Sequence, residues 1–417
     1  MILLTHCFLG TPRFSFVKSR LTTLDAVGIG VASMLGAGVF VVFGPVAELT
    51  GTLMPLAILV AGFVAYLNAG SVSQLAAKVS KSGGAYSYAR HYLNPTWGFL
   101  AGVSFLVGKI GSSAAIALVV ARYMSPANLI PVALGAVLVM TLINIAGINR
   151  TALGSKVLAG ITLVFLGVLM SAALLAPSAS QGLGPGSILN VPSASALVFF
   201  AFAGYARVAT LSGEVANSVK SVPRAIAWSL GIVGAIYLML GLLLPAKLGR
   251  SLAGSLTPIA DLAEVSLPTM NADSVAVFAA IAGLGSLLAL LAGMSRTAAV
   301  MADDGELPRV FRVHLKNGVP IVAELAVAVL VALLVLSGSV VFTIGLSSFA
   351  VLSYYAIANL AAFRQPRVES TRPKWLNVVG LASCLLLALS VPGQGLVLGV
   401  VILAILLFLR WILVKLR

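Results

Sequence analysis

The chain has 417 residues, of which 60% are hydrophobic and only 9% are charged, and its mean hydropathy is +1.10. A soluble domain of this size cannot cover so much apolar surface, because folding leaves too few polar side chains to face water. The formal net charge of +15 would fit a nucleic-acid-binding protein, but no basic helix stands apart from the apolar stretches. The composition therefore indicates an integral membrane protein, all α-helical, with lipid and not nucleic acid as its surroundings.

The stretches without charged residues predict how often the chain crosses the membrane. A helix needs about 20 apolar residues to cross a bilayer, and several of these stretches are long enough for two crossings. Clusters of glycine and proline divide the longest ones. The divided pattern predicts about twelve spans, at residues 24–46, 53–77, 95–122, 127–147, 153–176, 194–215, 226–246, 273–297, 319–337, 340–362, 376–391 and 395–413.

The basic residues predict the orientation of these spans. If the N-terminus is cytoplasmic, 21 of the 26 lysines and arginines fall on the cytoplasmic side, and Arg122, Lys247 and Arg250 fall on the other side. This bias is typical of a multi-pass protein of the cytoplasmic membrane with both termini inside. We expect, in order, a cytoplasmic segment, five spans, an extracellular loop, five more spans, and two additional spans with a short tail, at residues 1–23, 24–176, 177–193, 194–362 and 363–417.

The first span contains a stretch with little side-chain cover. It reads GIGVASMLGAGVF over residues 28–40, and Ser33, Gly36, Ala37 and Gly38 leave the backbone almost bare near the middle of the bilayer. An unwound segment at this depth is tolerated only where protein or a cavity replaces the lost hydrogen bonds. Its N–H groups would attract a carboxylate. Close packing of an unbroken helix is the alternative for these glycines.

The sixth span contains a second candidate interruption, in the segment FFAFAGYARVATLSGEVANSVKSVPRAI over residues 199–226. If the helix opens around Ala203 and Gly204, the released carbonyl groups accept hydrogen bonds from an ammonium group. The two interruptions together would recognise a zwitterion through backbone alone. Interrupted helices five spans apart are also what an inverted-repeat transporter shows in its sequence.

These two segments, together with SGGAYSYARHYLNPTWGFLAG at 82–102 and SRTAAVMADDGELPRVF at 295–311, resemble the amino acid permeases of the amino acid–polyamine–organocation (APC) superfamily. The resemblance implies a LeuT-type fold, in which spans 1–5 and 6–10 form inverted repeats, helices 1 and 6 are discontinuous, and two further helices follow. It also implies site residues. The substrate carboxylate would bind the backbone of Ser33, Met34, Leu35, Gly36, Ala37 and Gly38.

The same resemblance assigns the substrate amino group to the backbone of Phe202, Ala203 and Gly204. In the family, an aromatic residue just before the second interruption covers the substrate, and here Phe200 or Phe202 would take that role. Packing or lipid contact is the alternative for these phenylalanines.

Two basic residues fall within predicted spans. Lys109 lies midway along 95–122, and a buried lysine can lose its proton near neutral pH. Some family members carry a lysine in span five that replaces a coupling sodium ion, but the corresponding part of this chain, near Thr162, has none. We therefore predict that Lys109 responds to protons, with a structural cation bonded to carbonyl groups as an equal alternative.

The second basic residue is Arg207, which would form an inner gate by pairing with Asp25 or Glu214; a static ion pair is the alternative. Acidic residues are nearly absent from the predicted spans, and a pocket for a cationic substrate would need a carboxylate, because an unpaired buried cation is costly. The sequence therefore predicts a neutral amino acid as substrate.

These observations predict a secondary carrier of amino acids that works by alternating access, with proton coupling first and exchange of amino acids or polyamines second. A membrane enzyme would need acid–base pairs, a metal cluster or an activated nucleophile within the spans, and the sequence shows none. A nutrient sensor with the carrier fold is a further alternative. No cofactor or metal is expected. The acidic residues in DDGELP at 303–308 fit a cytoplasmic turn with local ion pairs, and the sequence leaves the oligomeric state open.

Overall fold

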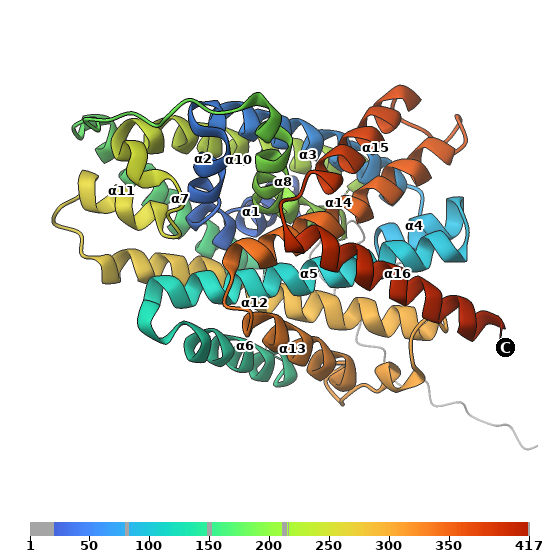
Figure 1. Ribbon diagram of the computed structural model, residues 1–417. Helices are drawn as coiled ribbons and strands as arrows, with labels where there is room; N and C mark the ends of the chain where they lie inside the picture. The colour runs from blue at the N-terminus through green and yellow to red at the C-terminus, as the bar shows by residue number, and fades with distance from the viewer. Residues whose placement is uncertain (1–20, 80–82, 148–151, 211–214, 216, 416–417) are drawn as a thin grey trace, which may run out of the picture.

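The computed structural model describes residues 21–79, 83–147, 152–210, 215 and 217–415 (Figure 1). Within these residues, the regular secondary structure is helical apart from two isolated bridges. The α-helices are α1 (Thr23–Met34), α2 (Phe43–Thr50), α3 (Met54–Ala76), α4 (Ala85–Tyr92), α5 (Pro95–Met124), α6 (Leu129–Ile145), α7 (Ala152–Leu175), α8 (Val191–Phe202), α9 (Ala206–Thr210), α10 (Ser218–Leu248), α11 (Pro258–Ser266), α12 (Ala272–Asp303), α13 (Ile321–Val335), α14 (Val340–Arg364), α15 (Lys374–Leu389) and α16 (Gln394–Lys415). Short 3₁₀ turns join several of them, and two matter for the site: η1 (Ala37–Phe40) and η5 (Ala203–Tyr205).

Each predicted span coincides with a helix or, at spans one and six, with helical segments separated by a 3₁₀ turn. In the described part of the chain, eight helical segments are long and apolar enough to cross a membrane, and four shorter apolar helices accompany them. The chain is therefore a multi-pass membrane protein. The number of twelve crossings stays a prediction.

The outer helices present apolar side chains outward, as expected of a protein surrounded by lipid. Helix α16 is exposed along most of its length through Val397, Val400, Val401, Ile405, Phe408 and Leu409. Helix α6 does the same through Leu138, Val139 and Leu142. Large exposed apolar faces of this extent are unfavourable in water and favourable in hydrocarbon.

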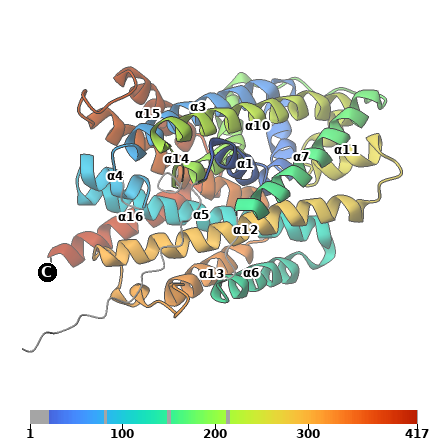
Figure 2. The ribbon, with the colours of Figure 1, turned by 180° about the vertical axis from the view of Figure 1, so that it is seen from behind.

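Helix α5 runs through the middle of the bundle, between α12 and α14 (Figures 1 and 2). Its glycines permit this close packing. A Cβ atom at Gly111 would lie 3.0 Å from the backbone nitrogen of Ser347 on α14, and one at Gly108 would lie 3.1 Å from that of Val351. Helices α6 and α13 lie side by side on one flank, whereas α3 and α10 lie on the opposite flank, in both views. Helix α1 lies next to α10 and α7, and α8 lies next to α3, α2 and α14.

The two ends of the bundle differ in chemistry, and we name them by the short helix that each carries. At the α4 end, Glu306 in the loop after α12 accepts hydrogen bonds from Arg90 on α4 and from Arg410 on α16. Burial and a hydrogen bond to Asp304 raise the pKa of the Tyr86 phenol, which donates to that carboxylate at 2.8 Å. Asp303, the last residue of α12, pairs with Arg312 in the following loop, which is a local ion pair of the kind predicted for DDGELP. Ion pairs and hydrogen bonds therefore connect α4, α16 and the loop after α12 at this end.

Candidate functional site

The two helix interruptions predicted from the sequence lie against each other in the interior. Helix α1 ends at Met34, and the 3₁₀ turn η1 follows after Leu35 and Gly36. Helix α8 ends at Phe202 and passes through η5 into α9. The chain thus leaves the α-helical conformation after Met34, whereas span six passes through a single 3₁₀ turn with no gap between its helical segments.

Glycine is required where the two breaks touch. A Cβ atom at Gly204 would overlap the carbonyl group of Ser33 and would lie 2.6 Å from the backbone nitrogen of Met34. On the other side of the contact, a Cβ atom at Gly38 would lie 2.9 Å from the Cα atom of Ala201. Both separations are shorter than a side chain tolerates, so the two backbones meet directly.

Tyr237 on α10 joins the ends of both interrupted helices, and sequence reasoning missed it. Its side chain is fully buried, and its hydroxyl group donates to the carbonyl oxygen of Met34 at 2.7 Å, with that of Ala201 at 3.2 Å. These carbonyl groups lie at or near helix ends, where the helix itself provides no donor. The sequence did contain a signal for this contact, because a tyrosine in an apolar span needs a hydrogen-bond partner for its hydroxyl group.

Further side chains surround the first interruption. A Cβ atom at Gly36 would lie 2.5 Å from the hydroxyl oxygen of Ser286 on α12. Tyr123, near the end of α5, donates from its hydroxyl group to the carbonyl oxygen of Phe40 at 2.6 Å. The Phe40 ring also stacks with that of Phe165 on α7, with centroids 6.5 Å apart. Helices α5, α7 and α12 thus enclose η1.

The structure separates the two phenylalanines proposed as a lid. The Phe200 ring lies beside the first interruption, 3.5 Å from the position that a Cβ atom at Gly38 would take. Phe202 instead packs against the Tyr237 ring, with centroids 5.0 Å apart, and faces Gly62 on α3. Of the two, Phe200 has the position that a lid over the interruptions would need.

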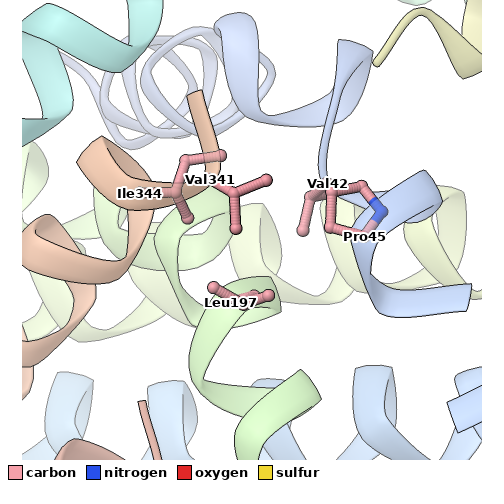
Figure 3. Close-up of a pocket in the computed structure, with 5 residues that line it drawn as sticks. All are labelled: Val42, Pro45, Leu197, Val341 and Ile344. Carbon is pink, nitrogen blue, oxygen red and sulfur yellow. The ribbon is translucent and has the colours of Figure 1, made fainter. Parts of the chain in front are cut away.

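Next to the interruptions is a narrow apolar hollow, shown in Figure 3. Its empty space is about 170 Å³, including the part that is open to the surroundings, and it is too narrow to admit a water molecule. The side chains that line it come from the segment around α2, from α8 and from α14: Val42, Pro45, Leu197, Val341 and Ile344. Only apolar groups meet here, so the hollow offers no hydrogen bond to a polar solute.

Lys109 is buried on α5, with 8% of its surface exposed. Among the residues that the structure describes, its ammonium group has neither a hydrogen bond nor an ion pair. One turn further along α5, the Ser112 hydroxyl group is hydrogen-bonded to that of Ser347 at 2.7 Å. The Thr162 hydroxyl group, in the segment where relatives carry a lysine, donates to the Leu158 carbonyl group. An unpaired buried cation is costly in a membrane span.

The proposed inner gate stays a prediction. Asp25 belongs to the capping box of α1, and its carboxylate accepts hydrogen bonds from the backbone nitrogen and hydroxyl group of Thr22 at 2.8 and 2.7 Å. Arg207 lies half-buried on α9. The pairing with Glu214 falls outside the described residues.

A buried carboxyl group lies in the first turn of α13. The side chain of Glu324 is completely buried and accepts a hydrogen bond from the Asn144 amide of α6 at 2.9 Å. Its other carboxyl oxygen has no partner within the described part of the chain. Glu324 therefore connects α6 and α13 on the flank of the bundle.

Lipid-facing helices around two segments that meet where their helices are irregular are the arrangement expected of a membrane transporter. The model of the family described as "Amino acid permease" matches residues 25–414. The chain therefore belongs to the amino acid permease family, within the APC superfamily, as the sequence motifs predicted.

Comparison with curated proteins agrees with this family assignment. An uncharacterized transporter of Mycobacterium tuberculosis is 40% identical over 93% of this chain and 90% of its own length. Cationic amino acid transporter 6, chloroplastic, of Arabidopsis thaliana is 25% identical over 84% of this chain and 66% of its own length. Cationic amino acid transporter 4 of Homo sapiens is 28% identical over 77% of this chain and 55% of its own length. The family and these relatives are transporters, so the chain is a transporter and not an enzyme.

Proposed function

We propose that the chain carries amino acids by alternating access, with the substrate held between the two interruptions. The observation that supports this most is the direct contact of Gly204 with the Ser33–Met34 peptide. Residues 33–38 would bind the carboxylate and residues 202–204 the amino group. Because the two backbones now touch, substrate enters only when the segments move apart, which is the motion that a carrier needs.

The orientation proposed from the sequence gives this motion a direction. The α4 end holds the clustered arginines Arg90, Arg312 and Arg410, and lies in the cytoplasm if basic residues mark the inner side. The α11 end then faces outward, and both termini lie on the cytoplasmic side of the cytoplasmic membrane. The contacts of α1 with η5 and of η1 with α8 would open toward one end at a time.

Proton coupling is the proposed driving force, with amino acid exchange as the alternative. Lys109 carries the proposal because it is buried and its ammonium group has no partner among the described residues. Loss of its proton would remove an unpaired charge from the interior. A carrier that exchanges one amino acid for another would need no such group.

Two substrate classes are candidates. The prediction of neutral amino acids depends on the scarcity of carboxylates in the spans, and the completely buried Glu324 lies on the flank of the bundle with Asn144. Two of the relatives are cationic amino acid transporters, which favours cationic amino acids instead. Each class predicts a different result in the same experiment.

The experiment is counterflow in proteoliposomes, in which the vesicles are loaded with one unlabelled amino acid and the uptake of the same labelled amino acid is followed. We expect uptake for a subset of amino acids, increased by an inwardly directed proton gradient. A sensor would bind an amino acid without counterflow. Absence of counterflow for all amino acids, with correctly folded protein in the vesicles, would refute the carrier.

A further inference from the structure

A cavity at the α11 end is separate from the narrow apolar hollow. It has a volume of about 460 Å³ and lies between the end of α5, helix α11 and the start of α12. Its size falls within the roughly 300–1,000 Å³ of small-molecule sites. The polar side chains on its wall are Arg122, Tyr123, Thr257, Asp261, Glu264 and Asn271.

The charged groups of this cavity are oriented but do not neutralise one another. Arg122 makes no ion pair within 4.0 Å to a described carboxylate, and its buried Nε atom donates to no described acceptor. Asp261 is held in place by the hydroxyl groups of Ser255 and Thr257, which donate to its two carboxylate oxygens. A buried donor without an acceptor is costly. The cavity thus presents a guanidinium group and carboxylates to a ligand.

The cavity is connected to the first helix interruption through one side chain. Tyr123 lines the cavity, and its hydroxyl group donates to the carbonyl oxygen of Phe40 at the end of η1. The Phe40 and Tyr123 rings also meet edge to face, with centroids 5.7 Å apart. A ligand in the cavity therefore lies one side chain away from the backbone that carries the proposed carboxylate site.

We propose that this cavity is an outer binding site for amino acids with a cationic side chain, a proposal that rests on the proposed carrier function and selects between its two substrate classes. The planar guanidinium group of Arg122 receives the α-carboxylate, which it can bind through two parallel hydrogen bonds. Asp261 receives the α-ammonium group. The exposed carboxylate of Glu264 receives the cation at the end of the ligand's side chain. Asp261 and Glu264 together carry one more negative charge than Arg122 balances, and a neutral amino acid would not balance that charge.

The test is equilibrium binding of L-arginine and of L-alanine to the purified full chain. We expect L-arginine to bind about tenfold more tightly than L-alanine, a difference that corresponds to about 1.4 kcal/mol. Glu264→Gln should remove this preference, and Arg122→Gln should weaken the binding of both ligands by about tenfold. The matched controls are Glu48→Gln and Arg250→Gln, exposed residues of the same end outside the cavity lining, which should bind as the unchanged protein does.

Loss of folding cannot imitate this result, because Glu264 is exposed and Arg122→Lys keeps the charge and should retain part of the binding. Equal binding of L-arginine in the unchanged protein, Arg122→Gln and Glu264→Gln would overturn the outer site. The proposed carrier function can be refuted independently of the outer site. If no amino acid shows counterflow but arginine binding still depends on Arg122, the outer site stands and the carrier does not.

Discussion

Gly204 is the residue on which the contact of the two interrupted helices depends most. Any Cβ atom there overlaps the Ser33 carbonyl group, so Gly204→Ala must push α1 away from η5. Overpacking of this kind costs about 1–3 kcal/mol. We expect a lower temperature of thermal unfolding in detergent and a loss of counterflow.

The matched control is Gly231→Ala on α10. A Cβ atom at Gly231 would have no neighbour within 4 Å, and alanine is the better helix former. This variant should keep both stability and transport. If Gly204→Ala behaves like Gly231→Ala in both measurements, the contact between the interruptions has no functional role.

Tyr237 supplies the hydroxyl group that holds the ends of α1 and α8. In Tyr237→Phe, the carbonyl oxygen of Met34 loses its donor in a buried place, which costs about 1–3 kcal/mol. We expect a lower unfolding temperature and an altered rate of counterflow. Tyr66→Phe, at a tyrosine with 51% exposure, should change neither quantity. An unchanged Tyr237→Phe variant would mean that another group satisfies these carbonyl oxygens.

Lys109 tests the proposed coupling. Lys109→Met keeps a long apolar side chain but removes the group that would release a proton. We expect counterflow to persist, whereas the increase of uptake by a proton gradient should disappear. Lys220→Met, at an exposed lysine near the start of α10, is the control and should retain that increase. Uptake and pH dependence that stay unchanged in Lys109→Met would reject a coupling role.

At the level of helices, the sequence predicted the long apolar elements well because their composition alone defines them. The short helices α4 and α11 were missed, since eight or nine residues with mixed polarity give too little of a periodic signal. The interruptions were predicted from Gly36, Gly38 and Gly204. The contacts that complete the site join residues far apart in the chain, such as Tyr237 with Met34, and no local pattern reveals such a pair.

The ionic cluster at the α4 end gives a prediction about helix α16. Glu306 has 9% side-chain exposure and accepts from Arg90 and Arg410 together, so it joins α4 to α16. Glu306→Gln leaves two guanidinium groups without their anion. We expect a loss of about 2 kcal/mol of stability, between the values for exposed and buried ion pairs.

Asp303→Asn is the control for this cluster. Asp303 pairs with Arg312 but has 62% side-chain exposure, and exposed pairs contribute about 0–1 kcal/mol. Thermal unfolding of both variants in the same detergent and salt checks the difference. Equal unfolding temperatures for Glu306→Gln and Asp303→Asn would contradict a role of Glu306 in joining the two helices.

For the whole molecule, composition and loop charges predicted a multi-pass membrane protein, and the motifs predicted its family. The substrate class could not be predicted in the same way. The cavity that bears on it is formed by Arg122, Asp261 and Glu264, which belong to α5 and to the missed helix α11. The prediction depended on carboxylates in and near the spans and therefore did not include Asp261 and Glu264.

The structure has the two interruptions in contact, and transport requires that they separate around the substrate. The most direct measurement uses the variant Ser33→Cys in a chain whose Cys7 and Cys384 are replaced by serine. The rate at which N-ethylmaleimide alkylates this cysteine is measured with and without an amino acid that shows counterflow. Residue 33 lies at the contact with Gly204, so we predict that a saturating amino acid slows alkylation severalfold, whereas a cysteine at exposed position 220 reacts at the same rate in both conditions. Equal alkylation of Ser33→Cys with and without the substrate would contradict a binding site between the two interrupted helices.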